Sequence, residues 1–443
     1  MKSLKWVALF IYYGFVLLIY LGRSVHWGFS HDENQFISAG QFLADHGLFP
    51  YVNYSYTHMP YGVFFYALTA KLSSYDYLAG RVLNSICWLV CSVLIVVIFR
   101  LFWKTKPSFA ALIWEFVLVY LFLNHPAMML IAGEALNHSL ASLFSLLALM
   151  FFILLMEGKY SSQWIAFGCG ACICLAALIR FNYASLIVVL FILFLIYKWV
   201  FNPPLILKTL LSFSAGLFTA SLPALVLIFR SPNAFYYGNI VYPRLNTIYY
   251  EQLLFKSNMD LASKIGGFLS HILSSPIDFI LYVLLIGMGI TSFIFLLRRI
   301  SPMDLGKLAL AGFAFTLFLT AFAPTPTQQQ YFFAPLPFLV VILAIIGFEI
   351  YQKNKWTFYL TVLVVLFALN PALKLANPLN DISYLSNPSQ WTPLQVHAFG
   401  DEIKQYVPRG RILTLIPMIP LEAGDEAYPF AATGRFHGAL PYC

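Results

Sequence analysis

Apolar runs long enough to cross a lipid bilayer alternate with short polar segments along most of the chain. A transmembrane helix needs about 20 consecutive, predominantly apolar residues. The pattern predicts about eleven such helices, at residues 6–22, 78–99, 109–124, 138–156, 164–180, 184–201, 206–229, 277–297, 306–323, 332–351 and 356–372. We therefore expect an all-α polytopic membrane protein whose transmembrane part covers residues 1–372.

Three segments outside these predicted spans are long: residues 23–77, residues 230–276 and the tail 373–443. Loops longer than about 15 residues usually have a function or are disordered. These three are rich in Tyr, Phe, Trp and Pro, which argues against disorder. All three fall on the same side of the predicted topology, so we expect the working face there. The tail, with a helix predicted near Val396–Val407 and a strand-like run at 411–416, would be a small extracytoplasmic appendage.

Composition and charge support the membrane assignment. The chain is 60% hydrophobic and only 10% charged, whereas a soluble domain has about 25% charged residues. This excludes a soluble enzyme, a disordered chain and a nucleic-acid-binding protein. The net charge of +8 is explained by the rule that Lys and Arg collect in cytoplasmic loops. Half of the 26 basic residues lie in short segments on one side of the predicted spans: Lys2, Lys5, Arg100, Lys104, Lys106, Lys159, Lys198, Lys208, Arg298, Arg299, Lys307, Lys353 and Lys355.

Most acidic residues lie on the opposite side of the membrane from these basic residues. Only Glu115, Glu157, Asp304 and Glu349 fall inside a predicted span or in its inner half. We therefore expect a multi-pass protein with a cytoplasmic N-terminus, an extracytoplasmic C-terminus and its polar chemistry on the outer face.

The densest group of polar residues follows the first predicted span. The sequence Ser30-His-Asp-Glu-Asn-Gln35 leads into residues 36–44, whose apolar positions have helical spacing, and Gly47 ends the segment. This pattern predicts a short amphipathic helix on the outer membrane surface. Ser30 and Glu33 have the spacing of a capping box, and acids in a first turn favour a helix N-terminus. A purely structural role for Asp32 and Glu33 therefore stays open.

The order of motifs in this loop indicates a family resemblance. The acidic pair Asp32-Glu33 is followed by the predicted helix, by Gly47, by Pro50-Tyr51 and by His58-Met-Pro60. This series resembles the first outer loop of the GT-C membrane glycosyltransferases, and among them the protein O-mannosyltransferase and aminoarabinose-transferase group. Shorter matches extend over nearly the whole chain, at residues 78–84, 132–136, 178–181, 233–244, 330–337 and 413–424.

The resemblance implies a GT-C-like fold and a transferase activity. Enzymes of this group move a sugar from a polyprenyl-phosphate carrier to an acceptor on the outer face of the membrane, and a single displacement would invert the anomeric carbon. The expected partners are the polyprenyl-phosphate sugar donor, a lipid, glycan or protein acceptor, and the bilayer. The tail is too small for the large lumenal domain of the eukaryotic mannosyltransferases, which favours a bacterial or archaeal enzyme, most simply one in a bacterial plasma membrane.

The resemblance also implies acidic site residues. Asp32 matches the family's acidic position and would act as the general base on the acceptor, with Glu33 as a helper or as the helix cap. Glu134 is similar to the acidic position that opens the family's fourth span. It would be either a member of the catalytic site or a salt-bridged structural group. Asp32 and Glu33, with His31 beside them, would permit a divalent cation but do not require one, so no cofactor or metal ligand is assigned.

Cations must stabilise the phosphate leaving group. The candidates are Arg81, Arg180, Arg244 and His58. Arg180 is the strongest because it ends an apolar span with no acid nearby in sequence, although a snorkelling arginine would look the same. His58 stands where the family often carries Lys, and a neutral imidazole is a weaker phosphate partner near pH 7.

Other functions remain open. A transporter or flippase would place charged groups near the bilayer midplane, in broken helices, whereas here only Glu115 is an acid well inside a span. A glycan polymerase or ligase acting on a lipid-linked oligosaccharide would rely on arginines in a large late outer loop. A non-catalytic protein would use Asp32 only to cap a helix.

Overall fold

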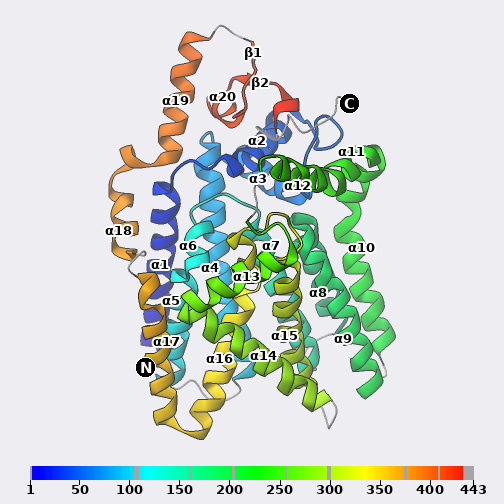
Figure 1. The fold of residues 1–443 in the computed structure, drawn as a ribbon, viewed down its shortest axis with the longest axis vertical. Coiled ribbons are helices and arrows are strands. Elements are labelled where there is room, and N and C mark those ends of the chain that lie inside the picture. The colour runs from blue at the N-terminus through cyan, green and yellow to red at the C-terminus, as the bar shows by residue number, and fades with distance from the viewer. Residues whose placement is uncertain are drawn as a thin grey trace.

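The computed structural model describes residues 2–103, 109–158, 162–201, 205–254, 257–296, 301–373, 377–407 and 410–432. Long helices run along the length of the molecule, and short helices gather at the end opposite the start of the first helix (Figure 1). We call this the loop end. Its elements are α2 (His31–His46), α3 (Tyr61–Leu72), α11 (Pro232–Tyr236), α12 (Tyr242–Gln252), α19 (Thr392–Tyr406), β1 (Arg411–Ile412), α20 (Met418–Glu422) and β2 (Glu426–Ala427).

Seven helical segments among the described residues are long and apolar enough to cross a membrane. The expected polytopic all-α membrane protein is therefore confirmed. The segments are Val7–His26 in α1 (Lys2–His26), Asp76–Phe102 (α4), His138–Glu157 (α7), Phe181–Phe201 (η1, Phe181–Ala184, with α9, Ser185–Phe201), Ile206–Arg230 (α10), Pro302–Thr320 (α15) and Gln329–Lys353 (η3, Gln329–Phe333, with α16, Leu336–Lys353).

Further apolar helices lie at the remaining predicted spans. α13 (Leu261–Ser274) and α14 (Pro276–Leu296) are bent by 113° at a short break, and together they would make an eighth crossing. α5 (Phe109–Asn124), α8 (Ser162–Ile179) and α17 (Lys355–Leu373) are apolar but shorter. Every predicted span thus falls on a helix, but the number eleven stays a prediction because these three helices are short for a full crossing.

The core of the bundle surrounds α16. This helix is buried along most of its length, from Leu336 to Phe348, because α4, α5, α14, α15 and α17 pack around it. By contrast, α9 and α10 expose large apolar side chains such as Val188 and Phe218. An apolar surface of this kind suits lipid rather than water.

The helix predicted in the first outer loop is α2. It begins after Ser30, whose backbone N–H donates to Glu33 Oε2 at 3.3 Å, and it ends at Gly47, which has a left-handed φ of 63°. The helix is more enclosed than one that lies on a membrane surface, because α3 and α20 cover its middle. A Cβ at Gly40 would lie 2.7 Å from the Cβ of Tyr66 in α3, so only glycine permits this close contact.

The tail packs back onto the bundle. α18 (Pro378–Ser383) lies against α1, where Arg23 and Asp381 form an ion pair at 2.9 Å. The helix predicted near Val396–Val407 is confirmed as α19. The strand-like run at 411–416 is a strand only over β1, which pairs in parallel with β2.

Some predicted features lie outside the described residues. These are residues 433–443 of the tail and the basic residues Lys104, Lys106, Lys159, Arg298 and Arg299. The described residues test neither the membrane orientation nor the division of the chain at residue 372, and both stay predictions.

Candidate functional site

A buried ion pair joins Glu33 of α2 to Arg81 of α4 at the loop end, and neither side chain is exposed. The two groups meet through Nε–Oε1 at 2.9 Å and Nη2–Oε2 at 2.7 Å. Glu33 also accepts the Tyr77 hydroxyl at 2.7 Å and the Ala135 backbone N–H at 2.6 Å. This bidentate, fully hydrogen-bonded geometry is what a buried pair needs to offset the desolvation of both charges.

The other N–H groups of Arg81 are also occupied. Nη1 donates to the backbone carbonyls of Ser24 at 2.6 Å and Trp27 at 2.7 Å, and Nη2 donates to that of Gly28 at 2.9 Å. All five guanidinium N–H groups therefore have acceptors within the protein. Arg81 ties the end of α1 and the segment after it to α2 and α4, and in this conformation it has no N–H group left to donate to a phosphate. Glu33 serves as the helix cap that the sequence allowed.

Glu134 lies in the turn between α6 (Pro126–Ile131) and α7. Its Oε1 accepts the indole N–H of Trp27 at 3.1 Å, and a Cβ at Gly133 would lie 2.7 Å from the same Trp27 side chain. Burial, followed by the negative charge of Glu33, raises the pKa of Glu134 to about 7. The charge of Asp32 also raises this pKa, so the two carboxyl groups are within electrostatic range. No Lys or Arg of the described residues lies within ion-pair distance of Glu134.

Arg180 lies in the turn between α8 and η1. Its Nη1 is 3.2 Å from Asn137 Oδ1 and 2.7 Å from His138 Nε2, and both of these partner residues are buried. The guanidinium carbon is 5.9 Å from the centre of the Tyr331 ring. These contacts hold the side chain against the bundle, whereas a snorkelling arginine would extend to water. Among the residues that the structure describes, no carboxylate lies within ion-pair distance of Arg180.

The predicted residues form two electrostatic pairs at the loop end, because the charge of Asp32 acts on Glu134 and the charge of Arg180 acts on His58. Asp32 and Arg180 both act on the Tyr331 hydroxyl. Burial, followed by the positive charge of Arg180, lowers the pKa of His58 to about 4, so its imidazole is neutral at pH 7. We call these four residues and Tyr331 the outer cluster.

Sequence reasoning did not select Asn137, His138 or Tyr331 as site residues. His138 is the first residue of α7, Asn137 precedes it, and Tyr331 belongs to η3 just before α16. Each stands where an apolar helix meets the short elements and turns that adjoin it at the loop end. That position was the available signal, because polar residues there can face a site without entering the hydrocarbon region.

Arg244 lies on the exposed side of α12. None of its described contacts reaches the outer cluster. Its helix is tied to the segment before η3, because Thr247 Oγ1 donates to the Thr325 carbonyl at 3.3 Å. A role for Arg244 in phosphate binding stays a prediction.

Within the described ranges, no group of three or more His, Cys, Asp or Glu side chains is arranged to hold a metal ion. Asp32 and Glu134 are within electrostatic range of each other, whereas Glu33 is paired with Arg81. A divalent cation stays a prediction, and it would need further ligands from substrate or water.

No protein-family model matches the chain, and no curated protein sequence does. Solved structures do match it. ArnT from Cupriavidus metallidurans bound to undecaprenyl phosphate gives a TM-score of 0.58 at 12% identity, over 96% of this chain and 85% of that chain. Its apo state gives 0.54 at 13% identity, over 96% and 86%. Archaeal AglB from Archaeoglobus fulgidus, in complex with an inhibitory peptide and a dolichol-phosphate, gives 0.50 at 15% identity, over 90% and 58%.

ArnT and the oligosaccharyltransferase AglB are GT-C fold enzymes. At these low identities the similarity shows the fold alone, and it extends over nearly all of this chain. The chain is therefore a multi-pass α-helical membrane protein with the GT-C fold, as the resemblance of its motifs indicated.

Proposed function

We propose that this chain is a membrane glycosyltransferase that moves a sugar from a polyprenyl-phosphate donor to an acceptor on the outer face of the membrane. The observation that carries the proposal is the state of Arg180. Its guanidinium rests on buried side chains without a carboxylate partner among the described residues, and the acidic residues Asp32 and Glu134 belong to the same cluster. Such an arginine is costly unless a ligand supplies the anion.

The choice of donor rests on chemistry and on fold. A phosphate is the anion that an arginine fork binds best, through charge-assisted hydrogen bonds. Among proteins of the same fold, ArnT is bound to undecaprenyl phosphate in one structure and AglB to a dolichol-phosphate in another. A lipid phosphate in this chain would place its head group at the loop end and its polyprenyl chain along the apolar helices.

The reaction is a single displacement. A nucleophilic oxygen or nitrogen of the acceptor attacks the anomeric carbon, while the bond between that carbon and the donor's phosphate oxygen breaks. Asp32 takes the proton that the nucleophile loses. Arg180 stabilises the negative charge on the departing polyprenyl phosphate. One displacement without a covalent sugar–enzyme intermediate inverts the anomeric carbon.

The remaining predicted residues take supporting roles. Glu134, with a pKa of about 7, strengthens Asp32 as a base when it is ionised. Glu33 and Arg81 position α2 and α4, because their hydrogen-bonding groups are already occupied. His58 contributes a hydrogen bond to the polyprenyl-phosphate sugar but carries no charge at neutral pH.

The test is sugar transfer by the protein reconstituted in lipid vesicles, from synthetic polyprenyl-phosphate sugars to lipid, glycan and protein acceptors. Asp32→Asn should lower the rate about 10²- to 10⁴-fold, the usual contribution of a general base, with an unchanged unfolding temperature. Asp45→Asn is the matched control in the same helix. Asp45 is exposed and lies 3.9 Å from an exposed Lys71, so this variant should keep full activity.

Full activity in Asp32→Asn would contradict the assignment of the base. Movement of a lipid-linked sugar across the vesicle membrane without transfer would favour a transporter or flippase instead. Extension of a lipid-linked oligosaccharide would favour a glycan polymerase or ligase.

A further inference from the structure

The tail is bonded to the loop end through the short segment around α20. The backbone N–H of Met418 donates to Asn34 Oδ1 of α2 at 3.0 Å. Glu422 Oε2 accepts the backbone N–H of Tyr77 in α4 at 2.9 Å. All four residues are buried. These bonds connect positions that are 384 and 345 residues apart in the chain, so they depend on the tail being folded against the bundle.

One bond reaches α2, which carries Asp32, and the other reaches α4, whose Arg81 holds α2 through Glu33. Asn34 follows Asp32 by two positions in α2, and Tyr77 precedes Arg81 by about one turn in α4. The residue before α4, Tyr75, makes no capping hydrogen bond. Glu422 therefore supplies the N-terminal cap of α4 from the far end of the chain, which satisfies an amide that would otherwise be left without a partner.

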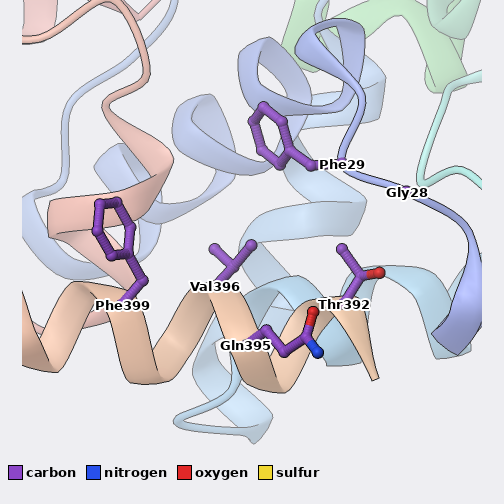
Figure 2. A pocket seen from close by; sticks show the side chains of 6 residues that line it. All are labelled: Gly28, Phe29, Thr392, Gln395, Val396 and Phe399. Carbon is purple, nitrogen blue, oxygen red and sulfur yellow. The ribbon is translucent and has the colours of Figure 1, made fainter. Parts of the chain in front are cut away.

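α19 packs against the α20 segment. His397 Nδ1 lies 3.2 Å from Glu422 Oε1, and Lys404 Nζ donates to the Ala423 carbonyl at 2.8 Å. Between α19 and the segment before α2 there is instead a pocket, lined by Gly28, Phe29, Thr392, Gln395, Val396 and Phe399 (Figure 2). The buried hydrogen bonds of the α20 segment, together with the packing of the His397 ring on Tyr75 at 4.4 Å, thus join the tail to α2 and α4.

We propose that the α20 segment positions the Asp32 end of α2, and that Glu422 is a positioning residue for the transfer reaction. This rests on the proposed function. The Tyr77 hydroxyl and Arg81 hold Glu33, the neighbour of Asp32, and Glu422 fixes the helix end from which both project. Arg180 stands on a different part of the fold, and none of its described contacts reaches the tail. Loss of Glu422 therefore displaces Asp32 relative to the donor phosphate.

The chemistry of Glu422 suggests its conservative replacement. Burial and the negative charges of Asp76 and Asp401 raise the pKa of Glu422 to about 8, although the hydrogen bond from Tyr77 opposes the rise. The carboxyl is therefore largely neutral at pH 7, facing Asp76 of α4 together with His397, Asp401 and Lys404 of α19. A Gln amide has the same shape and charge, and it keeps an oxygen for the Tyr77 N–H.

The first test separates kcat from KM in the reconstituted full-length protein. Glu422→Ala should lower kcat about 10- to 100-fold, the cost of misplacing a reacting group by about 1 Å. The KM for the donor should stay nearly unchanged because Arg180 is untouched. Glu422→Gln should recover most of the kcat. Glu426→Ala is the matched control in the same tail, since Glu426 is exposed and pairs with Arg411 on the surface at 3.0 Å.

The second test does not depend on activity. Hydrogen exchange at the Tyr77 and Met418 amides is measured in lipid nanodiscs, where Glu422→Ala should speed exchange and Glu426→Ala should not. A raised pKa favours docking of the protonated carboxyl, so protection at Tyr77 should fall as pH rises from about 4.5 to about 8 in the wild type. The fall should be smaller in Glu422→Gln, where Asp76 is the carboxyl that remains beside the Tyr77 amide, and this variant keeps the test available if Glu422→Ala does not fold.

The outcomes separate the two proposals. If the wild-type protein transfers no sugar, the proposed function fails, while the exchange experiment still reports on the role of the tail. An unchanged kcat in Glu422→Ala overturns the positioning role, whether or not exchange at Tyr77 changes. A pH dependence of protection that is as large in Glu422→Gln as in the wild type also overturns it.

Discussion

Arg81 and Arg180 both lie near the ends of apolar helices that face the loop end, and their surroundings are opposite. Arg81 is fully buried, and each of its N–H groups meets Glu33 or a backbone carbonyl. Arg180 contacts the neutral side chains of Asn137, His138 and Tyr331, with no carboxylate at ion-pair distance among the described residues.

The difference separates an arginine that serves the fold from one that can bind a ligand. A paired and fully hydrogen-bonded guanidinium has nothing left to offer a phosphate. An unpaired one keeps its charge for an anion that arrives from outside. Sequence reasoning placed both residues in one class because each stands near an outer loop. Their partners, which decide the matter, lie far away along the chain or on other helices.

The largest expected effect is loss of stability in Arg81→Ala. Removing one partner of a buried ion pair costs about 3–5 kcal/mol, because the Glu33 carboxylate is left buried and unpaired. The unfolding temperature in detergent should fall sharply. Arg244→Ala, which truncates an exposed arginine of α12, should leave it unchanged. A stable Arg81→Ala protein that no longer binds lipid phosphate would reverse the roles given to the two arginines.

Arg180→Ala should show the opposite pattern. Loss of one partner of a desolvated charge pair costs about 2–5 kcal/mol, which is roughly 30-fold or more in affinity for undecaprenyl phosphate. Without ligand, the variant should unfold at the wild-type temperature or above, because an uncompensated charge has been removed. Undecaprenyl phosphate should raise the unfolding temperature of the wild type but not of the variant. If Arg180→Ala binds undecaprenyl phosphate with wild-type affinity, Arg180 is not the arginine that binds the lipid phosphate.

Glu134→Gln tests the acidic side of the outer cluster through pH. The pKa of Glu134 is raised to about 7, so its contribution to folding stability is greatest below about pH 4.5 and is lost as pH rises to about 7. This component of the pH dependence should be absent from thermal unfolding of the variant. The transfer rate should fall less than about tenfold, since a group that accepts the proton directly contributes about 10²-fold or more. A pH profile identical to that of the wild type would contradict the assigned pKa.

The smallest effect is expected for His58→Gln. The pKa of His58 is lowered to about 4, so the variant loses a neutral hydrogen bond and no charge. Such a bond contributes about 0.5–1.5 kcal/mol, or roughly 2- to 10-fold in donor affinity. The ratio of wild-type to variant affinity should be constant between about pH 5.5 and pH 8, measured by titration with undecaprenyl phosphate. A ratio that grows toward acid pH would show that His58 acts as a cation.

Local sequence patterns predicted the positions of the helices and pointed to one of the candidate site residues, Arg180. The length of apolar runs placed helices at every predicted span, and the Ser30-x-x-Glu33 and Gly47 signals marked the two ends of α2. These features depend on neighbours within a few residues, so one sequence is enough to find them. Arg180 was accessible for the same reason, because the absence of a nearby acid can be read along the chain.

Features that depend on contacts between distant segments were not accessible. The sequence indicated a helix on the membrane surface, whereas α2 is enclosed because α3 packs on it and α20 of the tail folds back over it. It allowed Arg81 as a phosphate ligand, since nothing local shows that Glu33, 48 residues earlier, takes its charge. The sequence indicated that the tail is a small appendage, whereas in the structure Glu422 of the tail caps a helix that begins 346 residues before it.

The amino-acid sequence by itself determined that this is a polytopic helical membrane protein whose scarce polar chemistry gathers at one set of loops. A membrane-spanning segment must be a long apolar helix, and every charge within it costs free energy. The positions of these helices can therefore be predicted from the sequence. Only the tertiary structure decided which charges neutralise one another. Ion pairing and hydrogen bonding act over a few ångströms, and helix packing alone brings Glu33 to Arg81 while leaving Arg180 without a carboxylate among the described residues.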